Sequence, residues 1–238
     1  MRVSLTLLIC LICISAHATP LPYRLYSYDI PPFSMVNDGE FKGIAVNIVR
    51  TLFSRTQIAH QFDSAPLARG LMMTETEERT CVFPVQRAQD IEAKFTWISP
   101  ILVTRSGLFM NRAESRKLLA LGDARRYTVG ALRGSGDAEY LKKFGFNVTE
   151  TNSQEGSLRM LLSRRFEMLA TDSLSARYMM QQSSGAGSML VEVLTYRTSL
   201  GSIACNANMP SADVDRLQKT LGQMIRDGTL KKLTSAPF

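Results

Sequence analysis

An arginine follows a buried strand in the middle of the sequence. The apolar run at residues 81–85 has the length and β-branched content of a buried strand. Pro84 cannot donate a ladder hydrogen bond, so we expect the strand to end or bulge there. The polar turn that follows carries Arg87. A strand that opens into an arginine-bearing loop is typical of a ligand-binding rim, although a plain connection fits the same pattern.

Residues able to bind a metal or to drive catalysis are few. After the first 18 residues the only histidine is His60, and no paired cysteine or histidine spacing of a zinc site occurs. No nucleophile with a neighbouring base and no close pair of carboxylates can be assigned from the spacing. We therefore expect no metal, no cofactor and no catalytic residue, and a protein that is not an enzyme.

Two cysteines remain beyond the N-terminal segment, Cys81 and Cys205, each in an apolar, strand-like run. A disulfide between them would persist in an oxidising compartment. Because sequence spacing does not determine the separation of two Cα atoms, two alternatives stay open, a disulfide and a pair of buried free thiols.

The N-terminus has the features of a secretory signal peptide. Arg2 precedes an apolar run at residues 3–14, and Ala16 and Ala18 supply the small residues of a cleavage site. The run is shorter than the about 20 apolar residues of a membrane span. We therefore expect residues 1–18 to be removed on export to the periplasm, which leaves a soluble mature chain.

The charge and composition of the chain limit the kinds of partner that it can bind. The formal net charge is +7, but the basic residues are scattered without a run of five or more. A nucleic-acid footprint would cluster on one face, so we expect no nucleic-acid binding and a solvated basic surface instead. Apolar residues make up 45% of the chain and charged residues 21%, which favours a packed core over disorder.

The apolar periodicity alternates between that of a strand and that of a helix along most of the chain. Strands are predicted at residues 23–28, 60–62, 81–85, 102–110, 127–132, 147–151, 166–170 and 189–206. Helices are predicted at residues 44–53, 66–78, 113–121, 137–144, 154–165, 173–182 and 212–227. This alternation predicts an α/β protein of two lobes, each a mostly parallel sheet flanked by helices, with a ligand between them.

Several short motifs occur in the order and spacing of a known family. They are Tyr28-Asp29-Ile30-Pro31-Pro32-Phe33 with Gly43-Ile44, Pro84-Val85-Gln86-Arg87 with Trp97-Ile98-Ser99-Pro100-Ile101, Val129-Gly130 with Arg133-Gly134-Ser135, and Ala170-Thr171-Asp172. Together they resemble the polar amino-acid class of bacterial periplasmic solute-binding proteins over nearly the whole mature chain. The resemblance implies the type II periplasmic-binding fold, in which two lobes joined by two crossing strands close on a ligand.

On this resemblance we expect lobe 1 at residues 19–104 plus 197–238 and lobe 2 at residues 105–196. The resemblance also implies a monomer that captures a small polar solute, amino-acid-like or an amine, for a membrane permease of the ABC type. Two other functions stay open. One is a sensory or partner-binding module that acts through a separate receptor, and the less favoured one is an enzyme similar to periplasmic dehydratases.

The family's amino-acid site carries over only in part. Ile91 stands where family members commonly have the arginine that binds the ligand carboxylate, and Phe83, Pro84 and Gln86 stand at the preceding hydroxyl positions. Isoleucine cannot form the directional, two-bond pair that a guanidinium makes with a carboxylate. The resemblance therefore leaves the carboxylate without its usual partner.

This chain keeps two other residues of the family's amino-acid site. Asp172 matches the aspartate that takes the ligand amino group in the family, although its position between a strand and a helix also fits a helix N-cap. Ser135 keeps a hydroxyl beside a helix start, where free N–H groups suit an anion.

Three explanations for the missing arginine stay open. Another arginine has replaced it, with Arg133 favoured over Arg87 and Arg105 because it precedes the helix start. Alternatively, the solute has no α-carboxylate, so that Asp172 binds an amine beside an apolar and aromatic wall of Tyr28, Phe33, Phe83 and Ile91. In the third explanation, solute binding is lost and the fold serves as an interaction module.

Overall fold

The computed structural model describes residues 21–37, 39–182 and 189–235. The predicted signal peptide lies outside the described residues. Within these ranges, no helix combines the length and the apolar character that crossing a membrane requires.

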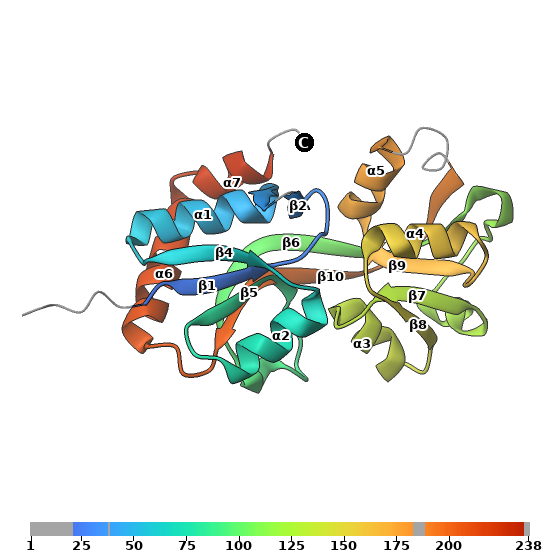
Figure 1. Ribbon diagram of the computed structural model, residues 1–238. Helices are drawn as coiled ribbons and strands as arrows, with labels where there is room; N and C mark the ends of the chain where they lie inside the picture. The colour runs from blue at the N-terminus through green and yellow to red at the C-terminus, as the bar shows by residue number, and fades with distance from the viewer. Residues whose placement is uncertain (1–20, 38, 183–188, 236–238) are drawn as a thin grey trace, which may run out of the picture.

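Eight strands form one continuous sheet in the order β4-β1-β5-β10-β6-β9-β7-β8. They are β1 (Tyr23–Ser27), β4 (His60–Ser64), β5 (Thr80–Gln86), β6 (Phe95–Asn111), β7 (Thr128–Leu132), β8 (Asn147–Thr151), β9 (Met168–Asp172) and β10 (Leu190–Asn206). β1 runs parallel to β4 and β5, and β7 runs parallel to β8 and β9. Between these parallel groups, β6 and β10 pair antiparallel and run through the middle of the molecule (Figure 1). The predicted α/β class with two lobes joined by two crossing strands is confirmed.

The first lobe contains β1, β4 and β5, and helices cover both of its faces (Figure 1). These helices are α1 (Ile44–Thr56), α2 (Leu67–Thr76), α6 (Ser211–Arg226) and α7 (Thr229–Thr234). Successive side chains of a strand point to opposite faces. Leu25 and Phe83 accordingly pack with α1 and α6, whereas Tyr26 and Val82 pack with the α2 side. The two short strands β2 (Met35–Asn37) and β3 (Glu40–Lys42) pair beside α1.

The second lobe contains β7, β8 and β9 and three helices. They are α3 (Gly136–Lys143), α4 (Gln154–Leu162) and α5 (Ser173–Gln182). Neighbouring residues of β6 divide between its two faces, since Leu108 packs with α3 and Phe109 packs with α4 and α5. The predicted lobe boundaries at 104/105 and 196/197 fall inside β6 and β10 and stay predictions.

β5 continues through Pro84 instead of ending there. Its pairing with β10 joins Val85 to Ser202 and Val82 to Ala204, so two residues of β5 face one residue of β10. This extra residue is a bulge, one of the two predicted outcomes, because a bulge tolerates the missing N–H of proline.

Cys81 and Cys205 form a disulfide, with their Cα atoms 3.9 Å apart. The two residues face each other in the antiparallel pairing of β5 and β10. The disulfide alternative is therefore confirmed over the pair of free thiols, and it joins strands that are 124 residues apart in sequence.

The helix predicted at residues 113–121 is wrong. The structure has two 3₁₀ turns instead, Arg112–Glu114 and Leu121–Arg126, with non-helical chain between them. Asn111 accepts a hydrogen bond from the Ala113 N–H, and Asp123 accepts from the N–H groups of Leu119 and Ala120. Such local side-chain bonds compete with the helical backbone pattern.

Candidate functional site

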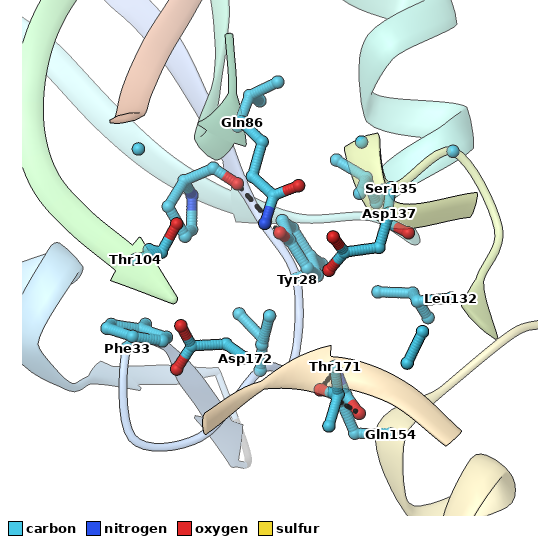
Figure 2. A pocket seen from close by; sticks show the side chains of 18 residues that line it. Tyr28, Phe33, Gln86, Thr104, Leu132, Ser135, Asp137, Gln154, Thr171 and Asp172 are labelled. Atoms are coloured by element: carbon cyan, nitrogen blue, oxygen red, sulfur yellow. Dashed lines mark hydrogen bonds between the residues drawn. The ribbon is translucent and has the colours of Figure 1, made fainter. Parts of the chain in front are cut away.

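A cavity lies between the lobes where the carboxyl ends of four strands meet. The chain segments that end β1 and β5 in the first lobe face those that end β7 and β9 in the second, and ligands of α/β proteins bind at such ends. The cavity is lined by Tyr28, Ile30, Phe33, Leu67, Pro84, Val85, Gln86, Thr104, Leu132, Gly134, Ser135, Gly136, Asp137, Gln154, Ala170, Thr171, Asp172 and Gly201. In Figure 2, Gln86 and Asp137 lie in the upper part of the view and Phe33 and Asp172 in the lower part.

The cavity is small and mostly apolar, and its charged groups are acidic. About 40 Å³ is open to water molecules, and one water needs about 10–15 Å³, so the space holds about three waters. The only charged residues that line it, among those described, are Asp137 and Asp172. The site in this geometry thus suits a group of few atoms that carries positive charge.

Asp172 is buried at the end of β9 and caps α5. Its Oδ1 accepts hydrogen bonds from the N–H groups of Leu174 (2.7 Å) and Ser175 (3.2 Å), and its Oδ2 accepts from the N–H of Arg105 (2.9 Å). A carboxylate has about four acceptor positions, so one position on Oδ2 remains for a ligand. Burial raises the pKa of Asp172 above 3.8, because the ionised form loses hydration, although the three N–H donors oppose the change.

Asp137 lies in the first turn of α3 and pairs with Arg197 of β10. One Asp137 oxygen, Oδ1, accepts from Arg197 Nη2 at 2.7 Å and from the Tyr196 hydroxyl at 2.8 Å. The side chains of Asp137 and Arg197 are only 6% and 16% exposed, so this ion pair is shielded from solvent. The carboxylate also lines the cavity. Asp137 therefore presents a partly neutralised negative group to any solute.

Arg197 connects the second lobe to the first. Its Nη2 also donates to Gln86 Oε1 at 2.5 Å, and its guanidinium lies 4.8 Å from the centre of the Tyr140 ring. The Nε atom is buried and has no hydrogen-bond partner. Gly136 of the second lobe packs closely against Gln86 of the first, since a Cβ added at Gly136 would lie 2.6 Å from Gln86 Oε1. A guanidinium can donate to one carboxylate through Nε and Nη2 together. Arg197 donates to Asp137 through Nη2 alone.

Five of the nine site residues expected from the sequence line this cavity. They are Tyr28, Phe33, Gln86, Ser135 and Asp172. The Tyr28 hydroxyl is buried and donates to the Pro84 carbonyl at 2.8 Å, and this burial raises the pKa of Tyr28 far above its usual value. The Ser135 hydroxyl accepts from the Ala138 N–H and caps α3.

Phe83 and Ile91 do not line the cavity, contrary to expectation. Phe83 is fully buried on the α1 side of the sheet. Its ring packs edge-on against the ring of Phe62, with the two ring centres 5.8 Å apart. Its neighbour Pro84 lines the cavity instead. Ile91 packs against the core on the α2 side. The expected apolar wall therefore consists of Tyr28 and Phe33 without these two residues.

None of the three arginines expected as carboxylate partners reaches the cavity. Arg87 pairs with Glu92, and its guanidinium lies 5.7 Å from the centre of the Trp97 ring. Arg133 is 54% exposed and lies 3.5 Å from Glu150. Arg105 is exposed, and it is its backbone N–H that contacts Asp172. The structure therefore does not bring Arg87 or Arg133 to this cavity, and a role of either arginine in solute binding stays a prediction.

The sequence reasoning missed Asp137 and Arg197. Asp137 is the first residue of the helix predicted at residues 137–144, and an acidic residue in a first turn is explained by a favourable helix-dipole contact alone. Arg197 lies in a strand whose side chains alternate between half-buried and exposed, which does not distinguish it from a surface residue.

The fold has many counterparts among solved structures. A sensor domain of a histidine kinase with similarity to periplasmic binding proteins matches with a TM-score of 0.81 and 15% identity, over 90% of this chain and 94% of that one. The chain has the type II periplasmic-binding fold. An ancestral arginine-binding protein bound to arginine shares this fold, with a TM-score of 0.76 and 17% identity over 89% of this chain and 96% of that one.

A third counterpart with the type II periplasmic-binding fold is an ancestral amino acid-binding protein described as a precursor of cyclohexadienyl dehydratase. Its TM-score is 0.76 and its identity 17%, over 89% of this chain and 93% of that one. No protein-family model and no curated protein sequence matches the chain. At these identities the counterparts show the fold, and the function rests on the site.

Proposed function

We propose that this chain is a solute-binding protein that captures a small polar solute between its two lobes. The observation that carries the proposal is Asp172, a buried carboxylate with one free acceptor position, in a cavity enclosed by both lobes. A buried carboxylate of this kind is best compensated by a cationic donor such as an ammonium group. The amino-acid-binding proteins that share the fold support the same class of function.

Delivery to a membrane permease of the ABC type in the periplasm is part of this proposal. The predicted signal peptide supports export, and the resemblance to periplasmic solute-binding proteins supports delivery to a permease. Binding is favoured over catalysis because the described residues around the cavity include no histidine, cysteine or lysine that could transfer a proton near neutral pH.

A sensory role is the second candidate. The histidine-kinase sensor domain that shares the fold supports it. A surface groove of about 410 Å³ also joins both lobes, since Leu174 of the second lobe lines it with Phe33, Ile101 and Leu230 of the first. Because lobe movement would change this groove, a receptor could read the bound state there.

The test is a thermal-shift screen of the mature protein against amino acids, amines and organic acids, combined with native mass spectrometry of freshly purified protein. We expect a raised melting temperature with one class or a co-purified small mass. A screen without a shift in any class, together with co-purification of a receptor, would replace solute capture by the sensory role.

A further inference from the structure

We propose that Asp137 holds, with its own carboxylate, the position that a solute carboxylate would take beside Arg197, so that the solute is a small amine without a carboxylate. This inference rests on the proposed solute-binding function and names the class of solute. It assigns Arg197 as the missing carboxylate-binding arginine and Asp137 as its internal partner.

The charges around the cavity favour an amine. Asp137 is paired with Arg197, whereas Asp172 contacts backbone N–H groups and no cationic side chain. An amine with one positive charge would therefore neutralise Asp172, the carboxylate that has no cationic side chain beside it. An amino acid would bring its own carboxylate into a space lined by Asp137, where two negative groups repel each other at low dielectric.

No described lysine or arginine side chain lines the cavity, so a solute carboxylate would find no cationic partner there. Arg87, Arg105 and Arg133 lie outside the cavity. The Ser135 hydroxyl already caps α3. The start of α3, which would suit an anion, carries Asp137 in its first turn. The protein thus supplies an anion of its own where a solute anion would be most stable.

Arg197 has unused capacity for a carboxylate. Asp137 takes only Nη2, and the neighbouring Nε has no hydrogen-bond partner although it is buried. A free carboxylate could accept from both nitrogens, which is the two-bond arrangement that guanidinium groups favour. Removing the Asp137 carboxylate should therefore create a site for a carboxylate brought by the solute.

The experiment compares pairs of ligands that differ only by a carboxylate. The pairs are alanine with ethylamine, serine with ethanolamine, and valine with isobutylamine. Isothermal titration is carried out on the wild type, Asp137→Ala and Asp137→Asn. The control is Glu139→Ala, which removes a charge from the same helix at an exposed residue paired with Lys142.

We expect the wild type and Glu139→Ala to bind the amine of at least one pair about tenfold or more tighter than the amino acid. In Asp137→Ala the preference should reverse by about 10- to 100-fold, because Arg197 is free to bind the carboxylate. Asp137→Asn keeps the volume and the contact with Tyr196, so it should lose the amine preference with a smaller gain for the amino acid.

A second measurement needs no solute. Acetate, titrated at constant ionic strength, should raise the melting temperature of Asp137→Ala by replacing the lost carboxylate, and should leave Glu139→Ala and the wild type unchanged. An equal response of all three proteins would overturn the assignment of the anion position.

The outcomes separate this inference from the proposed function. A wild type that prefers the amino acids is still a solute-binding protein, but the role of Asp137 is then wrong. A wild type that binds no member of any pair and shows no thermal shift in the wider screen contradicts solute binding itself, and the acetate titration still decides whether Asp137 fills an anion position.

Discussion

Two arginine–carboxylate pairs border the space between the lobes, and they differ in burial. Arg87 and Glu92 are five residues apart in one loop, and their side chains are 40% and 44% exposed. Arg197 and Asp137 are 60 residues apart and are 16% and 6% exposed. The first pair joins residues that are close in sequence and lies at the surface, whereas the second joins distant residues and brings Asp137 to the cavity.

The burial of an ion pair determines how much it contributes to stability and binding. A solvent-exposed pair gains little, because water and salt screen it. A buried pair has paid the loss of hydration for both charges, so that removing one partner leaves the other uncompensated. We therefore expect substitutions at the buried pair to change stability and solute choice, and substitutions at the exposed pair to change neither.

The largest effect is expected for Arg197→Ala. It leaves the Asp137 carboxylate buried without its cation and removes the contact with the Tyr140 ring. The free energy of unfolding should fall by about 3–5 kcal/mol, measured by urea denaturation. A loss below about 1 kcal/mol, the range of exposed pairs, would show that the pair is not effectively buried.

A pH series should separate Asp172 at the cavity from the exposed Arg87–Glu92 pair. An ammonium solute binds ionised Asp172, whose pKa burial raises above 3.8. As pH falls through this raised pKa, Asp172 takes up a proton and affinity should drop by up to about tenfold per pH unit. Arg87 lowers the pKa of Glu92, so the carboxylate of the exposed pair takes up its proton at a lower pH than a free glutamate does.

Titration calorimetry measures this affinity from neutral pH down to 3.8. The contribution of Asp172 to the stability of the solute-free fold should increase as pH falls, because the folded state binds the Asp172 proton more tightly than the unfolded state does. An affinity that stays constant down to the ordinary aspartate pKa would remove Asp172 from the solute site.

Gly134→Ala tests the contact between the lobes. Gly134 has φ +76°, and an added Cβ would lie 3.1 Å from Ala68 Cα in the first lobe. Gly145 has φ +77° with open space around it, which makes Gly145→Ala a matched control. Both substitutions should lower stability by about 1–2 kcal/mol through backbone strain, but only Gly134→Ala should increase the radius of gyration in small-angle X-ray scattering. Equal scattering from both variants would exclude a close contact at Gly134.

The smallest effect is expected for Arg87→Ala. Because the pair with Glu92 is exposed, the free energy of unfolding should change by less than about 1 kcal/mol and solute affinity should stay the same. The same denaturation and titration experiments measure both quantities. A clear loss of affinity would return Arg87 to the site.

The sequence predicted most of the order of elements because their apolar periods differ. The resemblance to periplasmic solute-binding proteins supplied Asp172, Tyr28 and Phe33, and all three line the cavity. The sequence could not assign Phe83. β5 is apolar on both faces, so its pattern does not show which side chains face the cavity and which face α1.

Arg197 could not be predicted for a different reason. Its role depends on the antiparallel pairing of β10 with β6 and on the approach of Asp137 from α3, both of which are long-range contacts. The disulfide is similar, since only the pairing of β5 with β10 brings Cys81 next to Cys205. Local patterns predict elements, but they do not predict which distant residues meet.

The most direct test of the account is a competition between serine and ethanolamine for the wild-type protein, followed by titration calorimetry. These molecules share the amine for Asp172 and the hydroxyl, and they differ by the carboxylate that Asp137 should exclude. We expect ethanolamine to displace serine and to bind at least about tenfold tighter. Tighter binding of serine would contradict it, because Arg197 would then be available to the solute despite its pair with Asp137.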